Sequence, residues 1–195
     1  MPAEIRPTQN VARKATFDLI GHDLSGMSFL DLYAGSGAVG LEALSLGAKQ
    51  VTFVERAPLC VTTIEDNLRL LYGKDSTLLK HSTYEVLAAD VMASIKMLAR
   101  NKRTYDVVFF DPPYEQGLVK KTLKTIMAYD ILQPVSFVIA QHSYLESLPD
   151  FQERFSLIRH RKYGKSYLAI LERRQGVIWG GEGDDDEGGN LSRDV

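Results

Sequence analysis

The residues best suited to bind a small ligand lie between positions 29 and 40. Gly35, Gly37 and Gly40 have the G-x-G-x-x-G spacing and stand between an apolar segment and a segment of helical periodicity. A strand, a glycine turn and a helix in this order form the first unit of sheets that bind dinucleotides or nucleosides at the strand's carboxyl end. Asp31 falls at that end. Its carboxylate would repel a pyrophosphate but could accept hydrogen bonds from the ammonium of a methionyl group, unless it only caps the turn.

Two further carboxylates follow predicted strands. Glu55 ends the β-branched and aromatic segment 50–55, where it could bind both hydroxyls of a ribose. The same residue also fits the acid that follows the glycines of a nicotinamide-cofactor site. Asp90 follows the segment 84–89, where it could accept a hydrogen bond from an adenine amino group. It could equally cap a helix over 91–99, which is the commonest role of such an aspartate.

The most specific motif is Asp111-Pro112-Pro113-Tyr114, directly after the apolar and aromatic segment 105–110. Two prolines remove two backbone donors and stiffen the chain. The carbonyl groups of Asp111 and Pro112 are therefore available to outside donors, and Tyr114 adds a flat ring. Acceptors beside an aromatic face suit the exocyclic amino group of a stacked base. A plain proline turn is the weaker alternative, because the glycine unit belongs to the same predicted sheet.

The rest of the chain supplies the elements that must hold these residues together. Apolar periodicity predicts helices over residues 10–20, 38–46, 57–71, 91–99 and 116–129 and strands over 29–33, 50–55, 84–89, 105–110 and 135–140. Two antiparallel strands around Gly164, over 151–163 and 165–172, would close the sheet. The alternation of strands and helices predicts an α/β fold. We expect a mostly parallel seven-stranded sheet with an antiparallel C-terminal strand and helices on both faces.

Basic residues gather at two places in the sequence. The first lies in or beside the first predicted helix, after an extended opening over 5–10 that proline favours, and holds Arg6, Arg13 and Lys14. The second surrounds the turn at Gly164, has Tyr163 and Tyr167 interleaved, and holds Arg159, His160, Arg161, Lys162 and Lys165. Basic side chains among aromatic ones suit a nucleic-acid backbone, although a solvated helix and a charge-protected sheet edge also explain them.

The composition describes one globular domain with an acidic end. The 195 residues are 45% hydrophobic and 25% charged, with a net charge of −2. Six acids and one arginine give residues 175–195 a charge of −5, which leaves +3 for residues 1–174. We expect a domain over 1–174 and a disordered acidic, Gly/Asp-rich tail over 175–195. The lone Cys60 and the lack of a signal peptide or membrane span indicate a cytoplasmic protein, and scattered histidines predict no metal.

With these pieces placed, the chain resembles the bacterial small-subunit ribosomal RNA guanine-N2 methyltransferases, the RsmD-like family. The resemblance runs from about residue 5 to 172 and rests on Arg6-Pro7-Thr8, on 30–37, 40–45 and 53–55, on Asp111-Pro112-Pro113-Tyr114 and on Tyr163-Gly164. It implies the Rossmann-like fold of class I methyltransferases. It also implies methyl transfer from S-adenosylmethionine to the exocyclic N2 amine of a guanine in small-subunit (16S) rRNA, either free or within an assembling 30S particle. We expect a monomer without a metal or a membrane contact.

Residue types and the resemblance together give three sets of candidate site residues. The cofactor-binding set is Asp31, Tyr33, Ala34, Gly35, Ser36, Gly37, Glu55, Arg56, Asp90 and Val91. The catalytic set is Asp111, Pro112, Pro113 and Tyr114, with the ring of Tyr114 stacking on the substrate base. The substrate-binding set is Arg6, Thr8, Arg13, Arg161, Lys162 and Lys165.

Several features depart from the family pattern. Only Met1 to Ile5 precede Arg6, where relatives have a β-hairpin, and Lys14 and Gln141 stand where acids are usual. The acidic tail is not a family feature either. Two other functions fit the same motifs: an adenine-N6 methyltransferase that acts on DNA or RNA, and a non-catalytic nucleic-acid-binding module of the same fold.

Overall fold

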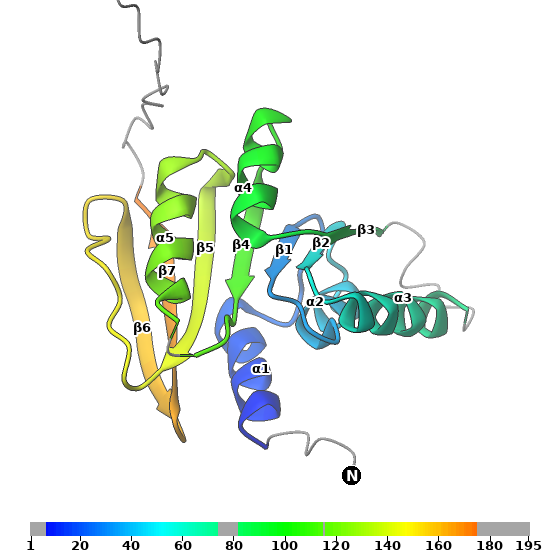
Figure 1. Ribbon diagram of the computed structural model, residues 1–195, viewed down its shortest axis with the longest axis horizontal. Coiled ribbons are helices and arrows are strands. Elements are labelled where there is room, and N and C mark those ends of the chain that lie inside the picture. Colours follow the sequence, from blue (N-terminus) through cyan, green and yellow to red (C-terminus); the bar gives the residue numbers. More distant parts are fainter. Residues whose placement is uncertain (1–6, 74–81, 115, 175–195) are drawn as a thin grey trace, which may run out of the picture.

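The computed structural model describes residues 7–73, 82–114 and 116–174 of the chain (Figure 1). Strands and helices alternate up to the fifth strand, and two strands in succession end the fold. In chain order the elements are α1 (Pro7–Ile20), β1 (Ser28–Leu32), α2 (Ala38–Ser45), β2 (Gln50–Glu55), α3 (Pro58–Tyr72), β3 (Thr83–Ala88), α4 (Val91–Arg100), β4 (Tyr105–Phe110), α5 (Leu118–Ala128), β5 (Leu132–Ser143), β6 (Phe155–Tyr163) and β7 (Ser166–Arg173).

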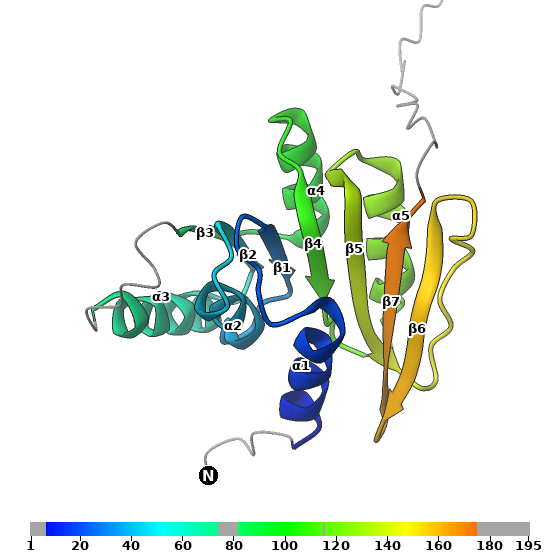
Figure 2. The same cartoon turned by 180° about the vertical axis from the view of Figure 1, so that it is seen from behind.

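The strands form a single sheet in the order β3-β2-β1-β4-β5-β7-β6 (Figures 1 and 2). β1 lies in parallel between β2 and β4, with Leu30 opposite Thr52 on one side and Val108 on the other. The chain moves outward from β1 to β3 and then returns to the other side of β1 at β4. In open α/β sheets, ligands bind beyond the carboxyl ends of the strands at such a reversal. The topology therefore predicts a site at the ends of β1 and β4.

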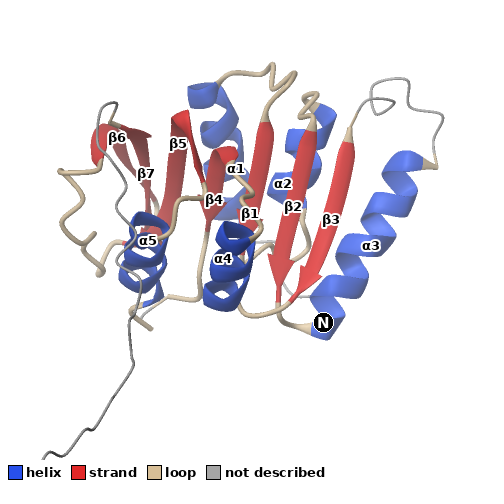
Figure 3. Cartoon of the chain, turned by 90° about the horizontal axis from the view of Figure 1, so that it is seen from above, coloured by secondary structure: helices blue, strands red, loops and turns tan. Residues whose placement is uncertain are grey.

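Helices cover both faces of the sheet, with α4 and α5 on one face and α1 and α2 on the other (Figure 3). Each face has its own apolar core. Phe17 of α1, Leu44 of α2 and Ile64 of α3 belong to one core. Ile95 of α4 and Leu123 of α5 belong to the other. Because helices bury both faces, the central strands are continuous apolar runs rather than alternating ones.

The last two strands form a tight hairpin. Tyr163 pairs with Ser166, so Gly164 and Lys165 alone make the turn. Gly164 has a φ of 59°, the left-handed backbone that the first position of a type II′ turn requires and that glycine adopts without strain. β7 runs antiparallel to β5, and the exposed residues 157–162 of β6 form the edge of the sheet. The hairpin thus brings the start of β7 to the carboxyl end of β5.

The predicted fold class is confirmed. Most element boundaries agree to within two residues, and the larger differences are at the start of α1, at both ends of β5, which reaches Ser143, and at the start of β6. α1 begins at Pro7 rather than near residue 10, because the fixed φ and missing N–H of proline suit the first residue of a helix. β5 begins at Leu132 rather than after Pro134, and its register with β4 shifts in this region, which lets the strand pass the proline. β6 begins at Phe155, because a turn precedes it.

Some predictions fall on residues outside the described ranges. Arg6 and the acidic tail over 175–195 lie there, so the disorder of the tail and the domain boundary at residue 174 stay predictions. Within the described ranges, none of the helices has both the length and the apolar character needed to cross a bilayer.

Helix α2 approaches the sheet closely at Gly40. A Cβ atom at this position would lie 2.3 Å from the Cε1 atom of the Phe53 ring, and Phe53 is fully buried. The Gly40 amide also donates a hydrogen bond to the Asp31 side chain. The last glycine of the G-x-G-x-x-G pattern is therefore required by the packing of α2 against β2.

Gly40→Ala should lower the free energy of unfolding by about 1–3 kcal/mol, because the added methyl group over-packs the core beside Phe53. Denaturant titration measures this loss. In a Phe53→Leu background the same substitution should cost much less, because the smaller side chain makes room. Equal costs in the two backgrounds would show that contact with Phe53 is not the cause.

Candidate active site

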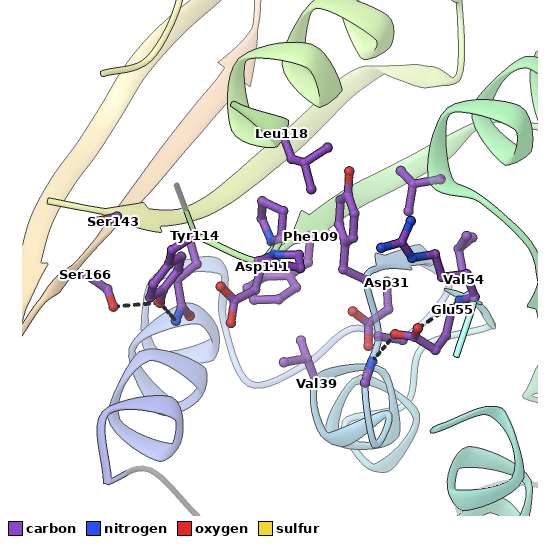
Figure 4. A pocket seen from close by; sticks show the side chains of 18 of the residues that line it. Asp31, Val39, Val54, Glu55, Phe109, Asp111, Tyr114, Leu118, Ser143 and Ser166 are labelled. Atoms are coloured by element: carbon purple, nitrogen blue, oxygen red, sulfur yellow. Dashed lines mark hydrogen bonds between the residues drawn. The ribbon is translucent and has the colours of Figure 1, made fainter. Parts of the chain in front are cut away.

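A large pocket opens at the carboxyl ends of β1, β2, β4 and β5 (Figure 4). Its volume is about 1510 Å³. Pockets that hold one drug-sized ligand measure roughly 300–1,000 Å³. This pocket therefore has room for a small cofactor together with part of a second molecule.

Asp31 lies in this pocket with 1% of its surface exposed. Its Oδ2 atom accepts the Gly40 N–H at 2.9 Å, which ties the end of β1 to the first turn of α2. Burial, and then the negative charges of Asp111 and Glu55, raise the pKa of Asp31 to about 7. A cation bound beside these carboxylates would favour the ionised form of Asp31. The site thus suits a positively charged ligand.

Glu55 joins the end of β2 to the glycine turn. Its Oε2 atom accepts the Gly35 N–H at 2.9 Å, and its Oε1 atom accepts the N–H groups of Arg56 and Ala57, both at 2.8 Å. The Oε1 atom thus uses both of its lone pairs, whereas the Oε2 atom uses one, so Glu55 could also accept from a ribose hydroxyl through Oε2. Replacement of Glu55 would loosen the turn as well as remove this ligand contact.

Asp90 is the N-cap of α4, which confirms one of its two predicted roles. Its Oδ1 atom accepts the N–H groups of Met92 at 2.9 Å and Ala93 at 3.2 Å. The residue is exposed and lines the pocket beside Val91. Its Oδ2 atom makes no hydrogen bond within the part of the chain that the structure describes, so it could accept one from a ligand. The capping role and a ligand contact are therefore compatible.

The Asp-Pro-Pro-Tyr segment follows β4 and lies beside the end of β1 (Figure 4). Pro112 is buried, Pro113 is exposed, and Asp111 and Tyr114 are partly exposed. Asp111 lies near enough to Asp31 for its negative charge to raise the pKa of that residue. The two halves of the predicted site, one after β1 and one after β4, thus share one pocket.

Tyr33 has a strained backbone at the end of β1. Its φ is 60°, which is uncommon for any residue other than glycine and typical of functional sites. Its hydroxyl lies 2.9 Å from the Thr122 hydroxyl on α5. Tyr33 therefore ties the central strand to a helix on the far side of the pocket.

The predicted substrate-binding residues are not all at the pocket. Arg13 and Lys165 line it, and the Arg13 Nη1 atom is 3.1 Å from the Glu42 carboxylate. Arg161 and Lys162 lie outside it, exposed on the edge strand β6. The side chain of Thr8, in α1, and the whole of Arg6 fall outside the description.

Most of the other candidates line the pocket. Nine residues of the cofactor-binding set line it: Asp31, Tyr33, Ala34, Gly35, Ser36, Glu55, Arg56, Asp90 and Val91. The tenth, Gly37, is buried at the start of α2. All four members of the catalytic set line it: Asp111, Pro112, Pro113 and Tyr114. Within the described ranges, no three His, Cys, Asp or Glu side chains group so that they could hold a metal ion.

Sequence reasoning missed several pocket residues. They include Val39, Met92, Phe109, Leu118, Lys121, Gln141 and Ser166. The sequence did mark Gln141 as unusual, because this residue departs from the family pattern at the end of the fifth strand. Nothing in the sequence marked Ser166, since it reaches the pocket only through the β6–β7 hairpin. Both residues hydrogen-bond to the hydroxyl of Tyr114, at 3.2 Å from Gln141 and 2.8 Å from Ser166.

Comparison with known proteins defines the class. The chain matches the structure of the SAM-dependent methyltransferase from Agrobacterium tumefaciens with a TM-score of 0.61 at 17% sequence identity, over 87% of this chain and 63% of that one. The fold is that of the class I methyltransferases, which use S-adenosylmethionine. The family model described as "Conserved hypothetical protein 95" matches residues 2–172. The protein belongs to this family.

Two curated relatives agree with this placement. YlbH from Bacillus subtilis is 32% identical over 169 residues, which make up 87% of this chain and 88% of YlbH. Ribosomal RNA small subunit methyltransferase D from Escherichia coli K12 is 27% identical over 169 residues, 87% of this chain and 80% of the relative. The predicted membership of the RsmD-like family is confirmed.

Asp31→Asn should flatten the pH dependence of stability. The folded protein holds the Asp31 proton more tightly than the unfolded chain, whose pKa is near 3.8, so stability falls as pH rises from about 4 to about 7. Asparagine can still accept the Gly40 N–H but carries no charge. Thermal unfolding across this pH range should therefore show a smaller decline in the variant. The exposed Asp90→Asn serves as the control, and an unchanged slope in Asp31→Asn would contradict the assignment.

Proposed function

We propose that the protein transfers a methyl group from S-adenosylmethionine to the exocyclic N2 amine of a guanine in small-subunit rRNA. The proposal is supported chiefly by one observation: the acidic residues beside the glycine turn and the Asp-Pro-Pro-Tyr segment line the same pocket. This pocket is larger than a single small ligand needs. The name of the E. coli relative, a small-subunit rRNA methyltransferase, supports the choice of substrate. A ribosomal substrate also agrees with a cytoplasmic location.

The cofactor fits the residues after β1, β2 and β3. S-adenosylmethionine, when bound, supplies an electrophilic methyl group on a positively charged sulfonium. Asp31 would accept from its ammonium group, Glu55 from a ribose hydroxyl and Asp90 from its adenine amine. Burial, and then the negative charges of Asp111 and Glu55, raise the pKa of Asp31, and a cationic ligand would offset these effects.

The substrate base fits the segment after β4. The lone pair of a guanine N2 amine is delocalised into the ring, so the amine is a poor nucleophile. The Asp111 side chain and the Pro112 carbonyl would accept hydrogen bonds from its two N–H groups. They would thereby hold the nitrogen in line to attack the methyl group. Asp111 can take the proton that the amine loses as the new N–C bond forms. Tyr114 would stack on the base, which must first leave its RNA stack.

The RNA backbone fits the basic side of the molecule. Arg13 and Lys165 line the pocket, and Arg161 and Lys162 continue the positive charge along β6. Residues 1–174 carry +3, so the body attracts a polyanion although the whole chain carries −2. We also propose that the protein acts as a monomer, on either free RNA or an assembling 30S particle.

Asp111→Ala should lower the rate of methyl transfer about a hundredfold or more, with little change in S-adenosylmethionine affinity, because it removes a contact to the reacting amine. Glu55→Gln is the matched control, since it should weaken cofactor affinity instead. Single-turnover transfer to small-subunit rRNA and cofactor titration measure the two effects. Full activity in Asp111→Ala would remove this motif from the chemistry.

The identity of the product tests the substrate assignment. Mass spectrometry of nucleosides from the treated rRNA should show N2-methylguanosine. N6-methyladenosine would overturn the guanine assignment in favour of the adenine alternative. RNA binding without any methyl transfer would indicate a binding module.

Replacing Arg161 and Lys162 together by alanine should weaken RNA binding and flatten its salt dependence. Each lost phosphate contact should reduce the slope of log K against log salt by roughly 0.7–0.9. The control replaces Lys96 and Arg100, two exposed basic residues of α4, and should leave the slope unchanged. If the two double variants behave alike, β6 does not contact the RNA.

A further inference from the structure

The hydroxyl group of Tyr114 is held between two side chains from the sheet (Figure 4). The Tyr114 Oη atom lies 2.8 Å from the Ser166 Oγ atom, and the Gln141 Nε2 atom donates to it at 3.2 Å. The tyrosine proton can then be donated to Ser166, so one chain of hydrogen bonds runs from Gln141 through Tyr114 to Ser166. All three polar groups have a partner in this arrangement.

The two anchors are more deeply buried than the residue they hold. Gln141 and Ser166 are each 3% exposed, whereas Tyr114 is partly exposed on the segment that follows β4. Ser166 is the first residue of β7 and pairs directly with Ser143 of β5. Gln141 lies two residues before Ser143 and therefore points to the same face of the sheet. Two hydrogen-bonded strands thus fix both anchor groups in one place.

A ring that is fixed before its substrate arrives loses less freedom when a base stacks on it. A phenylalanine at position 114 would offer the same flat surface but nothing to either anchor. The hydroxyl of Tyr114 therefore has a purpose apart from stacking, which needs only the ring.

We infer that Gln141 and Ser166 are positioning residues that orient the Tyr114 ring to receive the substrate base. The inference rests on the proposed function, because that function gives Tyr114 the base as its partner. Neither residue touches the reacting atoms, so both act through Tyr114. The specificity of the pocket for a flat base in one orientation then depends on the pairing of β5 with β7.

The test compares Tyr114→Phe, Ser166→Ala and the double variant in single-turnover methyl transfer to small-subunit rRNA. Each single substitution should lower the rate about tenfold, and the double variant should be no slower than either one, because all three break the same chain. Cofactor affinity should stay unchanged. Ser136→Ala is the control, because Ser136 is also buried in β5 but its hydroxyl has no hydrogen-bond partner in the described structure. Losses that multiply in the double variant, or an equal loss in Ser136→Ala, would overturn the inference.

A second pair of variants separates positioning from packing. Gln141→Glu replaces the donor with an acceptor of the same size. The Tyr114 hydroxyl can then donate to residue 141 and accept from Ser166, so the chain of hydrogen bonds reverses but is not broken. This variant should retain most of the rate, whereas the similarly sized Gln141→Met should lose it. Equal rates in these two variants would also overturn the inference.

A measurement without turnover keeps the inference distinct from the proposed function. In protein with ¹³C-labelled tyrosine rings, the Tyr114 signal is identified by its loss in Tyr114→Phe. Ser166→Ala should shift this signal and average the two sides of the ring, because the ring then flips faster. An unchanged spectrum would contradict the anchoring. If the spectrum changes but the wild-type protein methylates no guanine, the anchoring stands and the proposed function fails.

Discussion

The hydrogen bond from the Gly40 amide to the buried carboxylate of Asp31 is the contact on which the cofactor end of the pocket depends. It joins the central strand to the helix that follows the glycine turn, at the point where Gly40 lets α2 approach Phe53 closely. A second carboxylate, Glu55, holds the middle of the same turn from the neighbouring strand. Two acids that could bind a ligand therefore also shape the loop that surrounds it. Structure and binding cannot be separated at these positions.

The order of the strands places two kinds of chemistry side by side. β1 and β2 end in carboxylates, which suit a cation, and β4 ends in a proline-stiffened segment with an aromatic ring. Since β4 pairs directly with β1, the two groups are neighbours although they lie far apart in the sequence. The negative charge of Asp111 contributes to the raised pKa of Asp31 across this junction. A methyl donor and a methyl acceptor would meet there.

The fold could be predicted because its signals are local. The glycine turn, the apolar runs and the N-cap at Asp90 each depend on residues close in sequence. The anchoring of Tyr114 could not, because Gln141 and Ser166 reach it only through the pairing of two antiparallel strands. The beginning of α1 was misplaced because proline is compatible with both an extended segment and a first helical turn. Contacts between distant segments are invisible to periodicity and spacing.

The hairpin of β6 and β7 has a consequence for the protein's synthesis. The pocket takes residues from α1 near the beginning of the chain and from Lys165 and Ser166 near the end of the sheet. Domains fold as units while the chain emerges from the ribosome, and contacts between distant segments form late. The nascent chain therefore has no complete pocket until β7 has left the exit tunnel and inserted between β5 and β6. Completion of the pocket is thus one of the last steps in the folding of this domain.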